Sequence, residues 1–331
     1  MVIISSQNSD VSTGEVMDWL RSMGKQVYRI NGESFEAALG NFQLQIGTDA
    51  NPDFTLETEG RKISSSEINA FWFRRSAIDE TATSRLDSLH VSPALQQQMA
   101  GHMGMEATAL QSAFFTWLSD KNVLGNFQVK GLNKLAVLRL ARQSGLDIPA
   151  TIVTNSRENL LTFARQYPEM ITKCISEVRP LRDNGKTLGM YTSSISLEDA
   201  QTLPEYFAPS LFQENIQKAF EIRIFYLDGE MYPMAIFSQL DPTTAVDFRQ
   251  YNHEKNNRTV PYALPQPVRE KITFLMEQLS LNTGSIDIIR SVDRRYVFLE
   301  VNPVGQFGMV SKPCNYFLEK KIAQFLTRTE N

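Results

Sequence analysis

The sequence contains few of the residues on which zinc centres and disulfide-stabilised domains depend. Only two cysteines and three histidines occur among its 331 residues. None of them has the spacing that zinc ligands usually show. Cys174 and Cys314 are most simply read as reduced thiols, although a bond between them stays open at this point. These shortages argue against a zinc enzyme and against a disulfide-rich secreted domain.

Excess positive charge and long apolar runs are also missing. The formal net charge is −4 at pH 7, whereas a nucleic-acid-binding surface is usually basic. No apolar run is long enough to span a bilayer, and residues 1–7 lack the features of a signal peptide. We therefore expect a cytoplasmic protein with no nucleic-acid or membrane partner. A hydrophobic fraction of 42% is typical of a globular chain with a sizeable core.

Residues 1–122 form the first predicted domain. Strands are predicted at residues 3–4, 26–30, 41–46, 53–63 and 69–75, the last three as antiparallel runs. A capping box from Ser12 to Glu15 should begin a helix that ends at Gly24. Residues 80–120, rich in Ala, Leu, Gln and Met, predict a long helix.

The rest of the chain predicts a central α+β part at residues 123–204 and a strand-rich part at 205–331. Strands are predicted at 151–154, 170–175, 191–195, 211–214, 220–227, 231–239, 284–290 and 296–301. Helices are predicted at 133–143, 156–166, 266–279 and 315–326, and polar loops at 176–189 and 240–265. Asp228-Gly229 is a strong hairpin turn. The predicted fold class is therefore mixed α/β, with helices and antiparallel strands arranged as in α+β proteins.

Three oxygen-bearing side chains come together in the last predicted hairpin. Glu300 and Asn302 are two residues apart on a strand, so they share one face. If the strands pair around Asp293-Arg294, Asp287 lies opposite them. Hard oxygen ligands of this kind suit Mg²⁺, with nucleotide phosphates completing the shell. A solvated strand face with unrelated acids is the other interpretation, and the apolar neighbours disfavour it because unpaired carboxylates are costly there.

Two lysines upstream are candidates for contact with those phosphates. Lys134 begins a predicted helix, and Lys173 lies inside the apolar strand at 170–175. A lysine in such a strand either extends its amine to solvent or meets an anion. Solvent is the better interpretation for each lysine alone, but a neighbouring magnesium site favours phosphate contact.

A third group lies between the lysines and the acidic cluster. Glu221 and Arg223 are two residues apart, so their side chains share one face of a strand. A carboxylate there can accept both ribose hydroxyls, and the arginine can hold a transferring phosphate. A cross-strand salt bridge on a solvent face is an equally weighted alternative.

The order of these motifs resembles the ATP-grasp superfamily, from about residue 133 to 310. A helix lysine and a strand lysine are followed by Gln213-Glu214, then by Glu-x-Arg, and finally by Asp and Glu-x-Asn. The segments Leu-Glu-Val-Asn-Pro-Val-Gly-Gln-Phe at 299–307 and Ala-Phe-Trp-Phe-Arg-Arg at 70–75 narrow the resemblance. They look like the ATP-grasp maturases of graspetides, the microviridin-type peptide cyclases, and most like the grasp-with-spasm peptide maturases.

The resemblance implies an ATP-grasp fold with an N-terminal pre-ATP-grasp domain (1–122), a central subdomain (123–204) and a C-terminal antiparallel-sheet subdomain (205–331). ATP would lie between the last two. The implied ATP contacts are Lys134, Lys173, Gln213, Glu214, Ile216, Glu221 and Arg223. The implied ligands of two magnesium ions are Asp287, Glu300 and Asn302. Arg223, Arg249 and Asn302 would act at the reacting groups, although a surface role for Arg249 keeps equal weight.

Members of that family activate Asp or Glu side chains of a ribosomal precursor peptide as acyl phosphates. A Ser or Thr hydroxyl or a Lys amine then closes an ester or amide ring, with release of ADP and phosphate. The precursor, with leader and core, is thus the expected partner. The oligomeric state stays open between a monomer and a homodimer, although dimers are common in the family.

The peptide-binding candidates are Arg179, Arg182 and Lys186 in a polar segment, and Arg74 in the first domain. A solvated loop is the alternative for the polar segment. Two other functions also stay open. One is an ATP-grasp ligase that adds a free amino acid to a small molecule or a protein C-terminus. The other is a non-catalytic ATP-binding regulator, which the complete magnesium set and Arg223 disfavour.

Overall fold

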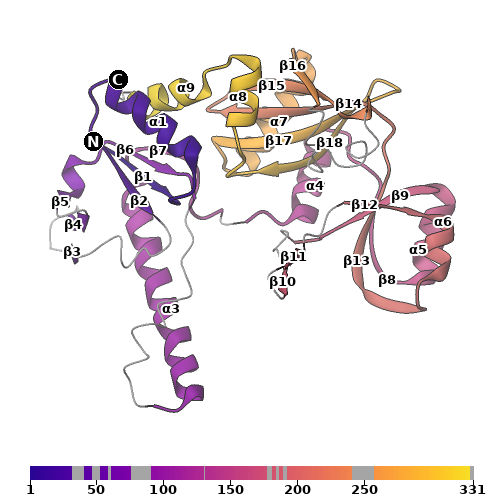
Figure 1. The fold of residues 1–331 in the computed structure, drawn as a ribbon, viewed down its shortest axis with the longest axis horizontal. Helices are drawn as coiled ribbons and strands as arrows, with labels where there is room; N and C mark the ends of the chain where they lie inside the picture. The colour runs from indigo at the N-terminus through magenta and orange to yellow at the C-terminus, as the bar shows by residue number, and fades with distance from the viewer. Residues whose placement is uncertain are drawn as a thin grey trace. The chain divides into compact units, whose positions relative to one another are not determined.

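The computed structural model describes residues 1–31, 41–46, 53–58, 61–75, 91–129, 131–176, 181–183, 186–188, 192–240 and 257–328. The chain divides into two compact units (Figure 1). Unit 1 comprises Met1–Lys130, Gln306–Ser311 and Phe317–Asn331, and unit 2 comprises Gly131–Gly305 and Lys312–Tyr316. Within the described part of the chain, no helix is both long and apolar enough to cross a membrane.

Unit 1 is built on a four-stranded parallel sheet with the order β2-β1-β6-β7. Its strands are β1 (Val2–Ser6), β2 (Val27–Asn31), β6 (Ala70–Phe73) and β7 (Asn122–Leu124). Strands β1 and β6 are buried along their whole length, as expected of a parallel sheet covered on both faces. The predicted antiparallel pairing of residues 69–75 was wrong. A short strand's apolar pattern does not specify its partner, and β6 pairs in parallel with β1.

The first helix, α1 (Val11–Ser22), begins two residues earlier than predicted. Its N-cap residue is Asp10, so the expected capping box beginning at Ser12 is not formed. The carboxylate of Asp10 does not cap the helix either, because it forms an ion pair with Arg74, with 3.0 Å between Oδ2 and Nε. Gly24 follows the helix with a φ of 70°, in agreement with the prediction that it ends there.

The remaining elements of unit 1 include segments from both ends of the chain. They are β3 (Asn41–Gln45), β4 (Asp53–Thr58), β5 (Arg61–Ser64), α3 (Pro93–Trp117) and α9 (Leu318–Leu326). Strands β3 and β4 pair antiparallel as predicted, but the single strand predicted at 53–63 is two strands, β4 and β5, that pair antiparallel with each other. Helix α9 packs on α1, β6 and β7. Only one closing helix was predicted, but a short helix, α8 (Gly308–Cys314), precedes α9.

Unit 2 contains a central four-stranded antiparallel sheet with the order β12-β9-β13-β8. Its strands are β8 (Thr151–Ser156), β9 (Glu169–Lys173), β12 (Ser193–Ser196) and β13 (Tyr206–Glu214). Its helices are α4 (Lys134–Gln143), α5 (Arg157–Gln166) and α6 (Leu197–Thr202). Part of the predicted loop at 176–189 forms a hairpin instead, from β10 (Leu181–Asp183) and β11 (Lys186–Leu188). The subdomain boundaries at 122/123 and 204/205 stay predictions. Because β13 pairs with β8 and β9, we propose that the central part continues to Glu214.

The second sheet of unit 2 has five antiparallel strands in the order β16-β15-β14-β17-β18. They are β14 (Lys218–Leu227), β15 (Glu230–Phe237), β16 (Arg258–Pro261), β17 (Thr283–Ser291) and β18 (Tyr296–Asn302), and α7 (Gln266–Gln278) follows β16. Asp228 and Gly229 both have positive φ, 49° and 88°, as a type I′ turn requires. The predicted hairpin at these two residues is therefore confirmed. Strand β16 lies within the predicted loop at 240–265.

Candidate functional site

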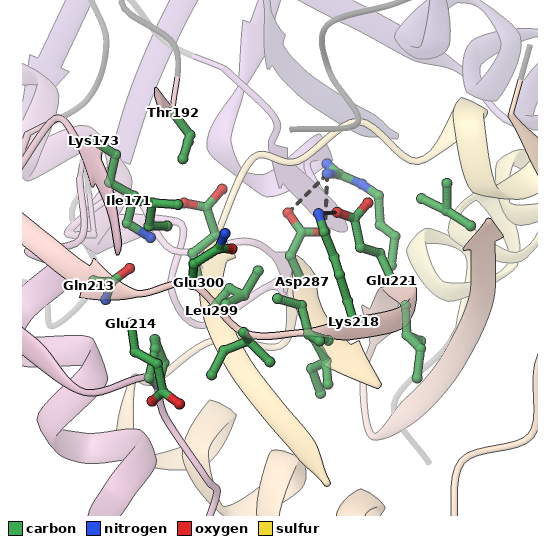
Figure 2. Close-up of a pocket in the computed structure, with 18 residues that line it drawn as sticks. Ile171, Lys173, Thr192, Gln213, Glu214, Lys218, Glu221, Asp287, Leu299 and Glu300 are labelled. Carbon is green, nitrogen blue, oxygen red and sulfur yellow. Dashed lines mark hydrogen bonds and ion pairs between the residues drawn. The ribbon is translucent and has the colours of Figure 1, made fainter. Parts of the chain in front are cut away.

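A pocket between the two sheets of unit 2 collects most of the predicted site residues (Figure 2). It has about 800 Å³ of empty space, part of it open to solvent. Predicted residues that line it are Lys173, Gln213, Glu214, Ile216, Glu221, Arg223, Asp287 and Glu300. Residues that lie far apart in the sequence therefore meet at one site, with cationic and anionic side chains among them.

The other predicted residues do not line this pocket. Lys134 and Asn302 are described but lie outside its lining. Arg179 and Arg249 fall outside the residues that the structure describes. For Arg182 and Lys186 the structure describes only the backbone, in β10 and β11.

The predicted acidic cluster forms through the pairing of β17 and β18. Asp287 lies directly opposite Glu300, and Asn302 lies opposite Ser285. The register shifts next to Asp287, as in a β-bulge. Successive residues of a regular strand point to opposite faces, but here Leu299 and Glu300 both line the pocket. Because of this bulge, the carboxylate of Glu300 and the aliphatic side chain of Leu299 both face the pocket.

Arg223 forms an ion pair with Asp287 across β14 and β17. Its Nη1 lies 3.2 Å from Oδ1 and 3.1 Å from Oδ2 of the carboxylate, and the two residues are directly opposed in the register. Their side chains are 10% and 15% exposed. An arginine that is partly exposed and lies beside two carboxylates can offset their negative charge in a metal-binding site, or it can bind a phosphate.

Asn302 comes after Glu300 in the sequence, and its side chain is held by the loop that follows it. Its Oδ1 accepts a hydrogen bond of 3.0 Å from the backbone N–H of Val304. The residue is exposed. Gly305 comes next to Ser285, so close that a Cβ on residue 305 would lie 2.3 Å from the Cβ of Ser285. The segment after Asn302 thus runs tightly along β17.

Lys218 belongs to the pocket although sequence reasoning did not select it. Its Nζ donates to Oε1 of Glu221, and the two side chains are 6% and 8% exposed. In the sequence it is a single lysine in a polar stretch before a strand, which is typical of a solvent-exposed residue. A cation three residues before Glu-x-Arg was the signal that could have identified it.

The two predicted phosphate lysines have different surroundings. Lys173, at the end of β9, lines the pocket. Lys134 begins α4, and its Nζ donates to the backbone oxygens of Cys174 (3.3 Å) and Ser176 (3.0 Å). Lys134 therefore holds the chain directly after Lys173. A phosphate contact by either lysine stays a prediction.

Gln213 lies in the middle of the central sheet, opposite Thr151 on one side and Ile171 on the other. It is fully buried. Its Nε2 lies 2.9 Å from Oγ1 of Thr151, which in turn donates to the backbone oxygen of Pro149 at 2.8 Å. Glu214 next to it accepts a hydrogen bond of 3.2 Å from the backbone N–H of Ala150.

Arg74 lies in unit 1 and is buried, with 3% of its side chain exposed. Besides Asp10, it donates to Oε1 of Gln306 at 3.3 Å, and its guanidinium stacks 5.3 Å from the ring of Phe307. Burial lowers its pKa to about 10, against the opposing effect of Asp10. Since this side chain already has partners inside the unit, we leave it out of the peptide-binding surface.

Comparison with known protein families matches residues 1–121 to the "MvdD pre-ATP grasp domain" family. No curated protein matches the sequence.

Several solved structures resemble nearly the whole chain. The macrocyclase MdnC from Microcystis aeruginosa, bound to its precursor peptide MdnA, is 28% identical, with a TM-score of 0.77 over 98% of this chain and 99% of that one. A RiPP-associated ATP-grasp ligase from Chryseobacterium gregarium, in complex with ADP and leader and core peptides, is 24% identical, with a TM-score of 0.78 over 98% and 94%. The ATP-grasp ligase PsnB, complexed with a minimal precursor, Mg and ADP, is 17% identical, with a TM-score of 0.75 over 98% and 96%. At 24% and 17% identity, the last two structures show only that this chain has the same fold as they do.

Proposed function

This chain is an ADP-forming ATP-grasp ligase of the family that includes the peptide macrocyclases, and from that premise we propose that it cyclises a ribosomal precursor peptide. Asp or Glu side chains of the precursor would be activated as acyl phosphates. Ser or Thr hydroxyls would then give esters, or Lys amines would give amides. Within that family, we also propose that the chain is most similar to the grasp-with-spasm peptide maturases.

The observation that carries this proposal is the convergence of predicted ATP and metal residues in one pocket. Lys173, Arg223 and Glu221 come from two different sheets, yet they line the same space as Asp287 and Glu300. A cleft that combines cationic side chains with two directly opposed carboxylates suits a magnesium nucleotide. The macrocyclase MdnC, similar along the whole chain, supports a peptide as the second substrate.

The carboxylates of Asp287 and Glu300 fit a magnesium site. Both are hard oxygen donors, and they lie directly opposite each other on neighbouring strands. Asn302 can join them, because an amide oxygen that accepts one hydrogen bond keeps a second lone pair. Bound magnesium would neutralise phosphate charge and polarise the phosphoryl group. We include two ions in the proposal, and PsnB with Mg and ADP supports the metal.

The chain's own residues would bind and orient the reactants. A substrate carboxylate oxygen attacks the γ-phosphorus, the bond to the β-phosphate oxygen breaks, and ADP leaves. A hydroxyl or amine of the peptide then attacks the acyl carbon and releases phosphate. Lys134, Lys173 and Arg223 would offset the repulsion between the anionic reactants. Arg249 is proposed to hold the substrate carboxylate.

The leader of the precursor is proposed to bind the region of Arg179, Arg182 and Lys186. These three cations lie within the segment that contains the β10–β11 hairpin. An acidic leader would be attracted to them. Replacing all three by Ser should weaken binding of a fluorescent precursor without changing ATP affinity, and an equal loss of ATP affinity would contradict a leader-binding role.

The function is tested with the full chain, Mg-ATP and any acidic, Ser/Thr/Lys-containing peptide that a gene beside its own encodes. We expect ADP release and loss of one water mass per ring. Asp287→Ala and Glu300→Ala should remove both signals and keep the far-UV circular dichroism spectrum. AMP and pyrophosphate as products would overturn the acyl-phosphate route. Transfer of a free amino acid to an acceptor, with no cyclisation, would establish the alternative ligase.

We also propose a homodimer that forms through the N-terminal half of α3. Residues 93–110 of this helix contain no buried side chain and only two ionisable ones, His102 and Glu106. Figure 1 shows this half extending beyond the sheet of unit 1. An exposed apolar helix surface usually marks an interface. Light scattering should give a dimer mass that Met105→Glu reduces to a monomer mass, and a monomeric wild-type chain would refute the interface.

A further inference from the structure

The four parallel strands of unit 1 all begin at the same edge of their sheet. The register pairs Val2 with Val27 and with Ala70, and it pairs Ala70 with Asn122. A second pocket lies at this edge, where Figure 1 marks the start of the chain with N. It has about 1260 Å³ of empty space, part of it open to solvent. Its lining combines the starts of these strands with the end of α9.

Cations from three separate elements line this second pocket. Lys25 lies before β2, Lys121 lies before β7, and Arg328 lies after α9. Among the described lining residues only Asp120 has an anionic side chain, and its Oδ2 lies 3.1 Å from Nζ of Lys121. Three cations less one carboxylate give these side chains a net charge of +2, in a chain whose formal net charge is −4. A bound anion would offset the repulsion between the three cations.

The backbone at Lys25 is held by the end of α1. Gly24, with a φ of 70°, ends this helix in a Schellman motif. Its N–H donates to the backbone oxygen of Arg21 at 2.9 Å, and the N–H of Lys25 donates to that of Leu20 at 3.0 Å. Lys25 therefore has a fixed position at the rim of the pocket, although the residue is exposed.

The elements that carry the other two cations are joined to each other. Asn122, next to Lys121, donates from Nδ2 to the backbone oxygen of Phe325 at 2.6 Å. The guanidinium carbon of Arg328 lies 5.1 Å from the centre of the Phe325 ring, a distance at which a cation is attracted to the face of a ring. The start of β7 and the end of α9 are thus held together, and Lys121 and Arg328 line one space.

The buried part of the lining is apolar. Val2, Ile68 and Leu326 line the pocket and are 3%, 1% and 2% exposed. Charges at the rim of an apolar surface attract an anion more strongly than charges surrounded by water. Since a water molecule occupies about 30 Å³ in the liquid, the space admits a chain of several phosphate groups. Two of the three cations are lysines, whose compact ammonium groups suit phosphate oxygens.

We propose that this pocket binds a polyvalent phosphate, namely a free oligophosphate chain. Lys25, Lys121 and Arg328 contact separate phosphate groups of it. The bound anion joins the end of α9 to the starts of β2 and β7, and it therefore stabilises unit 1. This site belongs to unit 1, whereas the proposed nucleotide pocket is lined by residues of unit 2. The inference therefore does not depend on the proposed function.

Urea unfolding of the full chain with tripolyphosphate, in the absence of Mg²⁺ and nucleotide, tests the inference. Tryptophan fluorescence reports on unit 1, because all three tryptophans lie there. Saturating tripolyphosphate should raise the tryptophan midpoint by about 0.5–1 M urea, since a ligand of the folded state opposes unfolding. Sodium chloride at equal ionic strength should not raise it, and an equal rise would overturn a specific site.

Removal of the three cations should weaken binding. Lys25→Gln, Lys121→Gln and Arg328→Gln together should weaken tripolyphosphate binding about tenfold or more. Lys25→Arg with Lys121→Arg keeps both charges and should keep the affinity. Unchanged binding by the triple Gln variant would overturn the proposal.

A matched control removes three other exposed cations of unit 1. Arg21→Gln, Lys62→Gln and Lys320→Gln together change the charge of the unit by the same amount, at positions outside the described lining of the pocket. This variant should keep the full effect of tripolyphosphate. An equal loss in the control would show that only the overall charge matters, and would overturn the site.

Asp120 allows a test of opposite sign. Asp120→Asn removes its negative charge and releases Lys121 from its ion pair. Tripolyphosphate should then bind about two- to fivefold more tightly. Weaker or unchanged binding would contradict the proposed role of the cations.

Two further outcomes separate the parts of the inference. Citrate at equal ionic strength should raise the tryptophan midpoint less than tripolyphosphate does, and an equal or larger rise would overturn the choice of phosphate. A wild-type midpoint that does not respond to tripolyphosphate would refute the site. It would leave the proposed function in place, because that function is measured by ADP release and ring formation.

Discussion

The ion pair between Lys218 and Glu221 provides a quantitative test of how the pocket is stabilised. Its side chains are 6% and 8% exposed. Lys218→Met preserves much of the side-chain volume but removes the cation that faces the Glu221 carboxylate. Breaking a buried pair from one side costs about 3–5 kcal/mol. Because the pair borders an open pocket, we expect about 3 kcal/mol, a large fraction of the roughly 5–15 kcal/mol that stabilises a protein.

Urea unfolding followed by two probes can assign this loss to unit 2. All three tryptophans of the chain, Trp19, Trp72 and Trp117, lie within Met1–Lys130. Tryptophan fluorescence therefore reports on unit 1, whereas far-UV circular dichroism also follows the sheets of unit 2. We expect Lys218→Met to lower the midpoint seen by circular dichroism by about 1 M urea, and the fluorescence midpoint to stay in place.

A double variant and a surface control complete the test. Lys218→Met combined with Glu221→Gln removes both charges, so most of the lost stability should return. Lys271→Met removes a lysine from the exposed face of α7 and should change the midpoint by little. If Lys218→Met behaves like Lys271→Met, the reasoning about the buried pair is refuted.

Three other predictions concern single positions. Arg223→Lys keeps the charge but loses the planar fork, so the rate of ADP release with precursor should fall by about 100-fold or more; an unchanged kcat would contradict its role. Gly305→Ala introduces a Cβ 2.3 Å from that of Ser285, and should lower the unfolding temperature by an amount equivalent to about 1–3 kcal/mol, unless Ser285→Gly is added. Burial raises the pKa of Cys314 to about 11, so iodoacetamide at mildly alkaline pH should alkylate Cys174 first. Peptide mass mapping would measure the two rates, and equal rates would contradict the protection of Cys314 by burial.

Local sequence patterns predicted the parts of the site that depend on short-range geometry. The turn at Asp293-Arg294 predicted that Asp287 lies opposite Glu300, and the register confirms the pair, but the bulge next to Asp287 that completes it was not predicted. Turn residues encode such hairpins directly. The presence of Glu221 and Arg223 on one strand face was predictable for the same reason.

Long-range partners could not be predicted in this way. The sequence contains no signal that Asp10 will pair with Arg74 rather than cap its own helix. Lys218 resembles an exposed lysine until β14 carries it beside Glu221 in a buried wall. The orientation of Gln213 depends on Thr151, sixty-two residues away. In each case the deciding interaction is set by tertiary packing rather than by neighbours in the chain.

The packing of α9 on α1, β6 and β7 has a consequence for synthesis of the protein. Six of the nine residues of α9 are buried, and they belong to the same unit as Met1–Lys130. On the ribosome, the N-terminal sheet is therefore made first but stays uncovered on one side until the last helix has emerged. During that interval its apolar surface is open to chaperones or to other nascent chains. A chain that stops before α9 should for this reason have a damaged N-terminal sheet, although that sheet is translated first.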